Sequence, residues 1–213
     1  MINLDAAAGS DNPSSIHSAG VLAAVKLTGA RELVAEALGA HADEIIFTGS
    51  GTEANNLAIL GVARHRVSMG HSVSGTHIIT LKTEHASVLE PCRALERAGF
   101  DVTYLGVKSD GLIDLAEFKK ALRPETLLVS ISYVNNEIGV IQPIHEIAKI
   151  LRKAKSQKLE ASSYPVFHSD ACQAPQYLDL NVARLGVDLL TLNSAKISNA
   201  KGVGVLYVKR GVA

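Results

Sequence analysis

The sequence has no excess of charge of either sign. Its 213 residues include 21 Lys and Arg against 21 Asp and Glu, which gives a formal net charge of zero at neutral pH. A strongly basic chain would be attracted to nucleic acid and to anionic membranes, and this balance provides no such attraction. We therefore expect a small-molecule ligand or a protein partner, and neither nucleic-acid nor membrane binding.

Cysteine is scarce and long apolar runs are missing. Two cysteines, Cys92 and Cys172, cannot build the framework of several disulfides that stabilises small secreted domains, so we expect reduced thiols packed as small apolar side chains. No apolar run approaches the roughly 18 residues needed to cross a bilayer. The start of the chain also lacks the basic and then apolar pattern of a signal peptide. These absences predict a cytoplasmic protein.

Several short catalytic motifs are absent. Neither GxxxxGK[ST] nor GxGxxG occurs, which disfavours a nucleotide P-loop and a dinucleotide fingerprint. GxSxG is missing, so a serine hydrolase of that type has no support. HExxH is missing too, and no third ligand stands at metal-like spacing beside His168 and Asp170. We therefore expect no metal site.

Apolar segments of strand length alternate with segments of helical periodicity along nearly the whole chain. This alternation predicts an α/β fold, with a mostly parallel sheet covered by helices on both faces, in a single domain of residues 1–213. Seven strands are expected, within residues 44–48, 76–82, 101–107, 126–133, 164–173, 187–193 and 202–210. Helices are expected over residues 52–67, 86–100, 115–122 and 144–158. Only about nine residues separate the last two strands, too few for a helical crossover, so we expect them to pair antiparallel.

A glycine-rich segment, Gly49–Thr52, lies between a predicted strand and a predicted helix. Its glycines permit a tight turn, and the N–H groups and partial positive charge at the start of a helix suit an anion such as phosphate. An ordinary strand-to-helix turn capped by Thr52 is the alternative.

Polar side chains follow two further predicted strands. His85 comes directly after one of them and could stack on a flat ring or transfer protons, or could simply cap the next helix. Asn135 and Asn136 follow another strand, where their amides could orient a ring substituent or a carboxylate, or close a turn.

An acid and a lysine follow two more strands. Asp170, with Gln173 three residues later, ends a strand where a buried carboxylate is costly unless it meets a cation. Lys196 follows the apolar run DLLTLN, and desolvation can turn such a lysine into a nucleophile or a Schiff-base former. A solvated loop lysine is the alternative.

The carboxyl ends of parallel strands meet at one edge of a sheet, where α/β proteins collect their ligands. An anion cradle, a stacking group, amides, an acid and a lysine would therefore lie close together. This combination matches the needs of pyridoxal phosphate, whose phosphate, ring, ring nitrogen and aldehyde each require one of these groups.

Longer segments strengthen this interpretation. NPSSIHSAG, IIFTGSGTEANNLAI, TEHASVLEPC, SYVNNEIGVIQPI, DACQAPQYLDL and KGVGVLYVKR occur in this order between about Asn12 and Arg210. They resemble the motifs of the cysteine desulfurase and selenocysteine lyase family, class V of the pyridoxal-phosphate aminotransferase superfamily. The resemblance implies the large domain of the type I pyridoxal-phosphate fold, with pyridoxal 5'-phosphate as cofactor.

The resemblance also implies roles for three charged or aromatic side chains. Lys196 would form the Schiff base with the cofactor and later serve as a base. Asp170 would meet the pyridine nitrogen. His85 would stack on the ring, and Lys196 and His85 together would form the catalytic pair.

The remaining implied contacts hold the cofactor. Gly51 and Thr52 would bind the phosphate. Asn136 and Gln173 would contact the side of the ring that carries the 3-hydroxyl. Ser194 would fall near a further phosphate contact.

The sequence departs from the family around the lysine. The family stretch resembles S-x-H-K-x-Y-G-P-K-G, whereas this chain reads NSAKISNAKG. Ala195 replaces a histidine that helps hold the phosphate, and residues 198–200 replace Tyr-Gly-Pro. We expect weaker cofactor binding and a more flexible loop.

The sequence stops where the family enters its C-terminal small domain, so we expect that domain to be absent here. In the family it carries the loop cysteine that attacks the substrate sulfur and the arginine that binds the substrate carboxylate. We therefore expect release of sulfur from L-cysteine, with L-alanine as the other product, to be weak or lost in this chain. Slow racemisation, transamination or β-elimination of an amino acid of the cysteine or alanine type, and a non-catalytic cofactor-binding scaffold, are the alternatives. A homodimer is expected from the resemblance, with a monomer as the alternative.

Overall fold

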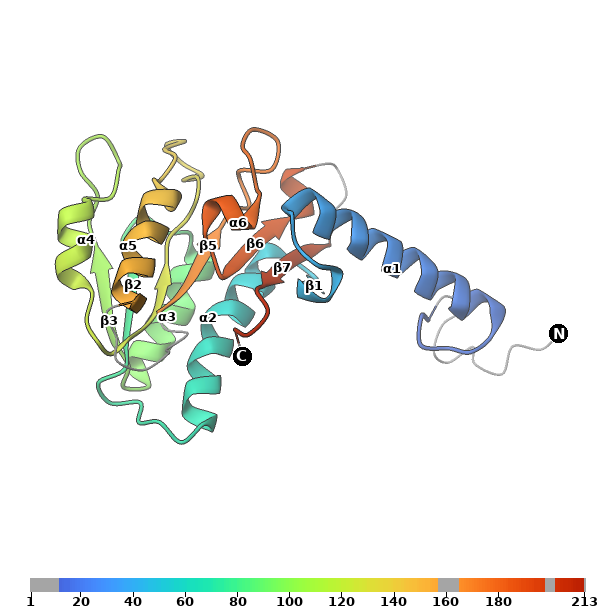
Figure 1. Cartoon of the computed structure of the whole chain (residues 1–213), viewed down its shortest axis with the longest axis horizontal. Coiled ribbons are helices and arrows are strands. Elements are labelled where there is room, and N and C mark those ends of the chain that lie inside the picture. The colour runs from blue at the N-terminus through green and yellow to red at the C-terminus, as the bar shows by residue number, and fades with distance from the viewer. Residues whose placement is uncertain (1–11, 157–164, 198–201, 213) are drawn as a thin grey trace.

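Seven strands form one sheet in the computed structural model, which describes residues 12–156, 165–197 and 202–212 (Figure 1). The strands are β1 (Ile45–Thr48), β2 (His77–Leu81), β3 (Asp101–Leu105), β4 (Thr126–Ser130), β5 (Val166–Asp170), β6 (Leu189–Asn193) and β7 (Gly204–Val208). Their order across the sheet is β1-β7-β6-β5-β4-β2-β3. The pairs from β3 to β6 are parallel, and β7 is antiparallel to both β6 and β1. The predicted mostly parallel sheet and the antiparallel pairing of the last two strands are confirmed.

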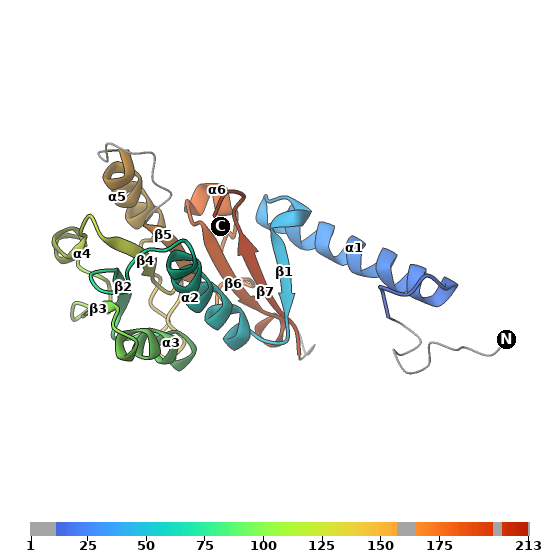
Figure 2. The same ribbon diagram turned by 90° about the horizontal axis from the view of Figure 1, so that it is seen from below.

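Helices cover both faces of this sheet, as predicted. They are α1 (Ser18–Leu38), α2 (Gly51–Ser68), α3 (Ala86–Arg97), α4 (Leu115–Ala121), α5 (Ile144–Ser156) and α6 (Val182–Leu185), with short 3-10 turns η2 (Ala42–Glu44) and η3 (Ser194–Lys196). One apolar core lies between the sheet and α2 with α3, and a second lies between the sheet and α4, α5 and α6. Figure 2 shows α2 and α3 on one side of the strands and α5 and α6 on the other.

The central strands are buried on both faces. In β2, Ile78 packs into the core under α2 and α3, while Ile79 packs into the opposite core. In β4, Leu128 packs into the core under α2 and α3, and Val129 packs into the opposite core. Successive side chains of a strand point to opposite faces, so a strand between two helical layers reads as a continuous apolar run. This pattern is why these strands could be recognised in the sequence.

The helix α1 was not among the predicted helices. Of its 21 residues only Gly20, Ala35 and Leu38 are buried, and the helix projects from the body of the molecule (Figures 1 and 2). An amphipathic stripe that faces a core is the usual sequence signal for a helix, and α1 does not pack along its length against the described residues. None of the helices in the described ranges is long and apolar enough to span a membrane.

Candidate functional site

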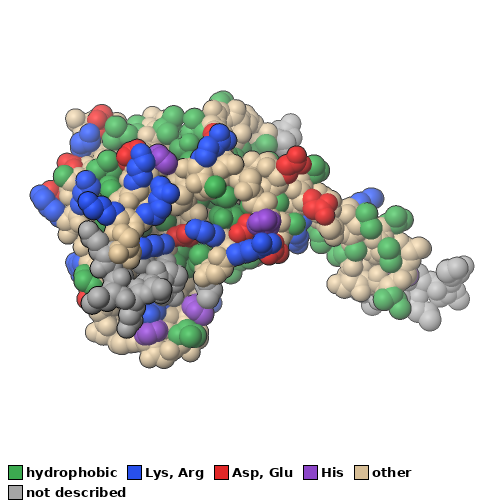
Figure 3. Space-filling view, viewed as in Figure 1, with side chains coloured by type: hydrophobic (Ala, Val, Ile, Leu, Met, Phe, Trp, Pro, Cys, Tyr) green, Lys and Arg blue, Asp and Glu red, His purple; other side chains and the backbone are tan. Residues whose placement is uncertain are grey.

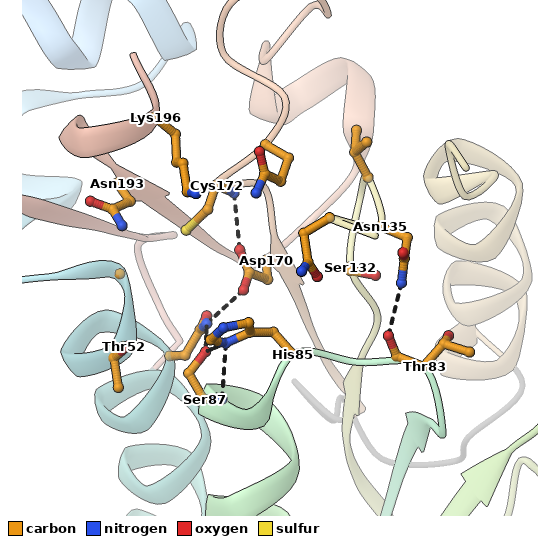
Figure 4. Close-up of a pocket in the computed structure, with 15 residues that line it drawn as sticks. Thr52, Thr83, His85, Ser87, Ser132, Asn135, Asp170, Cys172, Asn193 and Lys196 are labelled. Atoms are coloured by element: carbon orange, nitrogen blue, oxygen red, sulfur yellow. Dashed lines mark hydrogen bonds between the residues drawn. The ribbon is translucent and has the colours of Figure 1, made fainter. Parts of the chain in front are cut away.

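A pocket opens where β2, β4, β5 and β6 end (Figure 4). It lies at the carboxyl edge of the parallel strands, as the sequence pattern predicts for a ligand site. Seven of the eight predicted site residues line it: Gly51, Thr52, His85, Asn136, Asp170, Gln173 and Lys196. Ser194 is not among the lining residues, and its neighbour Asn193 lines the pocket instead.

The start of α2 forms one wall of the pocket. Ser50 is the N-cap residue, and its side chain accepts a hydrogen bond from the N–H of Glu53. The predicted alternative of a Thr52 cap is therefore wrong, because Thr52 already lies within the first turn. Among the described residues, the N–H groups of Gly51 and Thr52 have no hydrogen-bond partner, and the N-terminus of an 18-residue helix adds positive potential to these donors.

Gly51 permits close packing at this wall. A Cβ atom on Gly51 would lie 2.8 Å from Cys172 Sγ and 3.1 Å from Asn193 Cβ. A larger residue would thus displace Cys172, which follows β5, and Asn193, which ends β6. Glycine lets the backbone N–H groups of α2 face the pocket beside these segments.

Asp170 ends β5 at the floor of the pocket and is only 9% exposed. Its Oδ1 accepts a hydrogen bond from the Cys172 N–H at 2.9 Å, and its Oδ2 accepts one from Asn55 Nδ2 at 2.7 Å. An ionised carboxylate can accept about four hydrogen bonds. Asp170 can therefore accept a further donor from a ligand in the pocket.

His85 caps α3, which was one of the two predictions for it, and it also lines the pocket, where its stacking or proton-transfer role stays a prediction. Its Nδ1 accepts a hydrogen bond from the Ser87 N–H at 3.1 Å and lies 2.7 Å from Ser87 Oγ. These contacts fix the orientation of the ring at the pocket wall (Figure 4).

The two asparagines after β4 have different surroundings. Asn135 is buried: its Nδ2 donates to the Thr83 carbonyl at 2.9 Å, and its Oδ1 accepts hydrogen bonds from the N–H groups of Glu137 and Ile138. It thereby ties the loop after β4 to the loop after β2. Asn136 is exposed and lines the pocket, so its amide is available to a ligand.

Lys196 ends η3, directly after β6, and its side chain extends toward Cys172 and Asp170 (Figure 4). Gln176 stabilises this turn, because its Nε2 donates to the carbonyls of Lys196 at 3.1 Å and Ile197 at 2.7 Å. Asn193 caps the turn by accepting a hydrogen bond from the Ala195 N–H at 3.2 Å. The substituted residues 198–200 lie outside the described residues.

Both cysteines are free thiols. Burial, followed by the negative charge of Asp170, raises the pKa of Cys172 far above its usual range, although this residue lines the pocket. Burial also raises the pKa of Cys92 to about 12. Neither side chain is a thiolate near neutral pH, and the thiolate is the nucleophilic form of cysteine.

His168, which the sequence places beside Asp170 without a third metal ligand, is a core residue. It is fully buried in β5, and its two ring nitrogens lie 2.8 Å from Ser130 Oγ and 3.1 Å from Thr191 Oγ1. Burial lowers its pKa to about 4, so the ring is neutral. The described residues contain no group of three His, Cys, Asp or Glu side chains that could hold a metal ion.

Sequence reasoning missed polar residues that support the site. Asn55, Ser87, Thr83 and Ser132 also line the pocket, and each lies within or beside a motif already singled out. A usable signal existed for Asn55, because it is a polar residue on the apolar face of α2 that buries Ala54, Ala58 and Ile59. A buried polar residue in such a stripe indicates a partner.

Glu84 was missed as well, although it precedes His85. It is 6% exposed, and its Oε1 accepts a hydrogen bond from the Ser132 N–H at 2.7 Å. Its Oε2 has no hydrogen-bond partner in the described part of the chain. Burial, with a smaller contribution from the charge of Asp170, raises the pKa of Glu84 to about 8. A neutral carboxyl group therefore lies behind the pocket at neutral pH.

Comparison with known proteins identifies similar sequences. The profile of the aminotransferase class-V family matches residues 5–213. The chain is 48% identical over 201 residues to the cysteine desulfurase IscS of Dictyoglomus turgidum, covering 94% of this chain and 47% of that protein. It is 46% identical over 200 residues to the cysteine desulfurase IscS of Haemophilus influenzae, covering 93% and 46%. The chain thus spans about half the length of the curated relatives it matches.

Solved structures show the same architecture. A structure described as SspA in complex with cysteine superposes with a TM-score of 0.83 at 41% identity, covering 92% of this chain and 53% of that one. A NifS-like protein gives a TM-score of 0.84 at 34% identity, covering 93% and 51%. The family resemblance and the fold predicted from the sequence motifs are thereby confirmed.

Proposed function

Because the chain belongs to the aminotransferase class-V family, we propose that its pocket binds pyridoxal 5'-phosphate for the removal of sulfur from L-cysteine. Class-V aminotransferases and cysteine desulfurases depend on this cofactor. The observation that carries the proposal is the meeting, in one pocket, of the start of α2, the carboxylate of Asp170 and the amine of Lys196. L-Cysteine is proposed as substrate because the curated relatives are named cysteine desulfurases and one similar structure contains cysteine.

The groups around the pocket fit this cofactor. Gly51 and Thr52 offer N–H donors to a phosphate at the positive end of α2. Asp170 offers carboxylate lone pairs to a protonated pyridine nitrogen, and Asn55 and Cys172 hold that carboxylate in place. Asn136 and Gln173 supply side-chain amides for the 3-hydroxyl, while the implied Ser194 contact stays a prediction.

The side chains of the pocket would then divide the work. When bound, the cofactor withdraws electrons from the bonds of the substrate α-carbon. Lys196 would hold the cofactor through its Nζ amine, and the same amine would accept and return protons at the substrate α-carbon. His85 would lie against the cofactor ring and would provide a second proton-transfer group.

The described thiols do not provide a strong sulfur acceptor, because the raised pKa values of Cys92 and Cys172 keep both protonated. We therefore propose that the 213 residues alone, as a single domain, turn over L-cysteine weakly or not at all. The same observation favours a second candidate, slow proton transfer at the α-carbon such as racemisation, because that chemistry needs Lys196 but no thiolate.

We also propose a homodimer in the cytoplasm. The apolar side chains exposed on α1 suit a second copy of the chain, and the free thiols of Cys92 and Cys172 suit a reducing compartment.

The role of Lys196 is tested by adding pyridoxal phosphate to the purified chain. We expect a visible absorbance band that survives gel filtration, and borohydride should fix the cofactor to the peptide that contains Lys196. Lys196→Ala should lose both signals, whereas Lys149→Ala, on the exposed face of α5, should keep them. An unchanged band in Lys196→Ala would show that the assignment is wrong. Brisk release of sulfide from L-cysteine by the parent chain would contradict its proposed weak activity.

A further inference from the structure

A continuous set of hydrogen bonds connects Asp170 to His85 behind the pocket (Figure 4). Asn55, which is 1% exposed, donates from Nδ2 to Asp170 Oδ2 at 2.7 Å and to Ser87 Oγ at 2.9 Å. Ser87 Oγ lies 2.7 Å from His85 Nδ1, and the Ser87 N–H donates to the same nitrogen at 3.1 Å. Two buried polar residues from α2 and α3 thus connect the acid of the pocket to its imidazole.

The orientation of the Asn55 amide follows from its neighbours. Asp170 Oδ2 accepts a hydrogen bond, so it must face the NH2 group of Asn55 and not the amide oxygen. That orientation leaves Asn55 Oδ1 buried without a partner in the described part of the chain. A buried carbonyl oxygen without a partner is unfavourable. The arrangement is explained if the Asn55 NH2 group is needed to donate to both Asp170 and Ser87.

The direction of the remaining bonds follows in turn. Ser87 Oγ accepts a hydrogen from Asn55, so its own hydroxyl hydrogen is free to point at His85 Nδ1. The Ser87 N–H can only donate, and it also points at this nitrogen. His85 Nδ1 is therefore an acceptor and carries no proton, which places the single proton of the neutral ring on Nε2.

We infer that Asn55 and Ser87 are positioning residues that lock His85 in the tautomer with its proton on Nε2. A ligand in the pocket then meets an N–H donor on His85, because Nδ1 is occupied from behind. The inference rests on the proposed function in one respect: the lock matters for catalysis only if His85 faces the cofactor and its substrate.

Helix capping alone would not require this arrangement. An N-cap side chain needs only to accept the backbone N–H of Ser87, and that bond would remain if the hydroxyl and the Asn55 amide were absent. A purely structural role therefore predicts that removing the hydroxyl leaves the tautomer unchanged. A positioning role predicts that the two tautomers begin to mix.

The tautomer is measured from the 15N resonances of the imidazole nitrogens in the cofactor-free protein, at a pH where the ring is neutral. In the parent chain we expect a protonated Nε2 and a bare Nδ1, with a wide gap between the two resonances. Ser87→Ala and Asn55→Leu should narrow the gap as the tautomers mix, and Ser87→Thr should restore it. A protonated Nδ1 in the parent, or a gap that is unchanged or wider in Ser87→Ala, would overturn the inference.

The chain offers matched controls. His145 Nδ1 lies 2.8 Å from the Arg184 carbonyl, which can only accept, so His145 should show the opposite tautomer in the same spectra. Asn56→Ala changes the neighbouring amide of α2, which bonds the Thr52 carbonyl, and should leave the resonances of His85 in place. Circular dichroism of each variant checks that it is folded.

Failure of this inference and failure of the proposed function are separable. The 15N measurement needs no cofactor, whereas the visible band after addition of pyridoxal phosphate reports cofactor binding alone. If His85 shows a single tautomer but the chain forms no visible absorbance band with pyridoxal phosphate, the inference stands and the proposed function is contradicted. If the absorbance band forms but the two tautomers of His85 are mixed in the parent chain, only the inference is contradicted.

Discussion

The helices α1 and α2 differ in what supports them. Seven of the 18 residues of α2 are buried, five of them in the core between the sheet and α3, whereas three of the 21 residues of α1 are buried. Val21, Leu22, Val25 and Leu33 on α1 are between 51% and 68% exposed. Figure 3 shows hydrophobic side chains on the surface of this projecting helix. α2 is therefore held by packing on the described core, whereas α1 contacts that core only near its C-terminal end, through Arg31, Ala35 and Leu38, and otherwise depends on its own backbone bonds and caps.

Truncating one buried and one exposed side chain provides the largest test of this comparison. Ile59 on α2 is fully buried, so Ile59→Ala should lower the free energy of unfolding by roughly 2–5 kcal/mol. Leu33 on α1 is 68% exposed in the single chain, so at a dilution where the chain is monomeric Leu33→Ala should change the free energy of unfolding by no more than about 0.5 kcal/mol. Urea unfolding of both variants measures the difference. A comparable loss for Leu33→Ala would show that the face of α1 is covered in solution.

Ionisation gives a second difference, between the buried Glu84 just before α3 and the exposed carboxylates of α1. The pKa of Glu84 is about 8 in the folded protein, above its ordinary value of 4.5, so the native state keeps a proton that the unfolded state has lost. Stability must therefore fall as the pH rises from 4.5 to 8, by up to about 1.4 kcal/mol per pH unit. Glu84→Gln removes this ionisation, and at pH 8 it should be more stable than the parent by an amount on the order of a few kcal/mol.

The pH range of the measurement matters, because His168 acts in the opposite direction. Its pKa is lowered from 6.5 to about 4, so it makes stability rise with pH over that interval. The difference between the slopes of the parent and Glu84→Gln from pH 6.5 to 8 isolates Glu84, because His168 contributes equally to both proteins. Glu36→Gln, on the exposed surface of α1, is the matched control and should leave the pH slope unchanged. An unchanged slope in Glu84→Gln would show that Glu84 is ionised in the native protein.

The same contrast explains what could be predicted from the sequence. Strands such as β2 and β4 were recognised because burial on both faces leaves an unbroken apolar run, and the strand ends then located Asp170 and Lys196. α1 was missed because few of its side chains pack on the described core. Asn55 and Ser87 were missed because their contacts are distant in the sequence. Asn55 bonds Asp170, 115 residues away, and Ser87, 32 residues away, and only folding brings these residues together.

The Ser194 contact stays a prediction, and the structure shows a second candidate beside it at the lysine turn. The family stretch S-x-H-K places its serine three residues before the lysine, and in this chain that position is Asn193. The side chain of Asn193 caps η3, and the residue lines the pocket, as Ser194 does not. In this turn the residue three positions before Lys196 lines the pocket, and the serine two positions before it does not.

The smallest expected effect concerns the exposed face of α1 itself. If a second copy of the chain covers this face, Val25→Glu places a charge in an apolar interface and should weaken self-association by at least about tenfold, or about 1.4 kcal/mol. Sedimentation at several protein concentrations measures the change. Ala37→Glu, also exposed but near the end of α1 that joins the sheet, should have a weaker effect. A parent chain that stays monomeric at all concentrations would remove the second copy as the partner of α1, and Leu33→Ala would then have no interface to disturb.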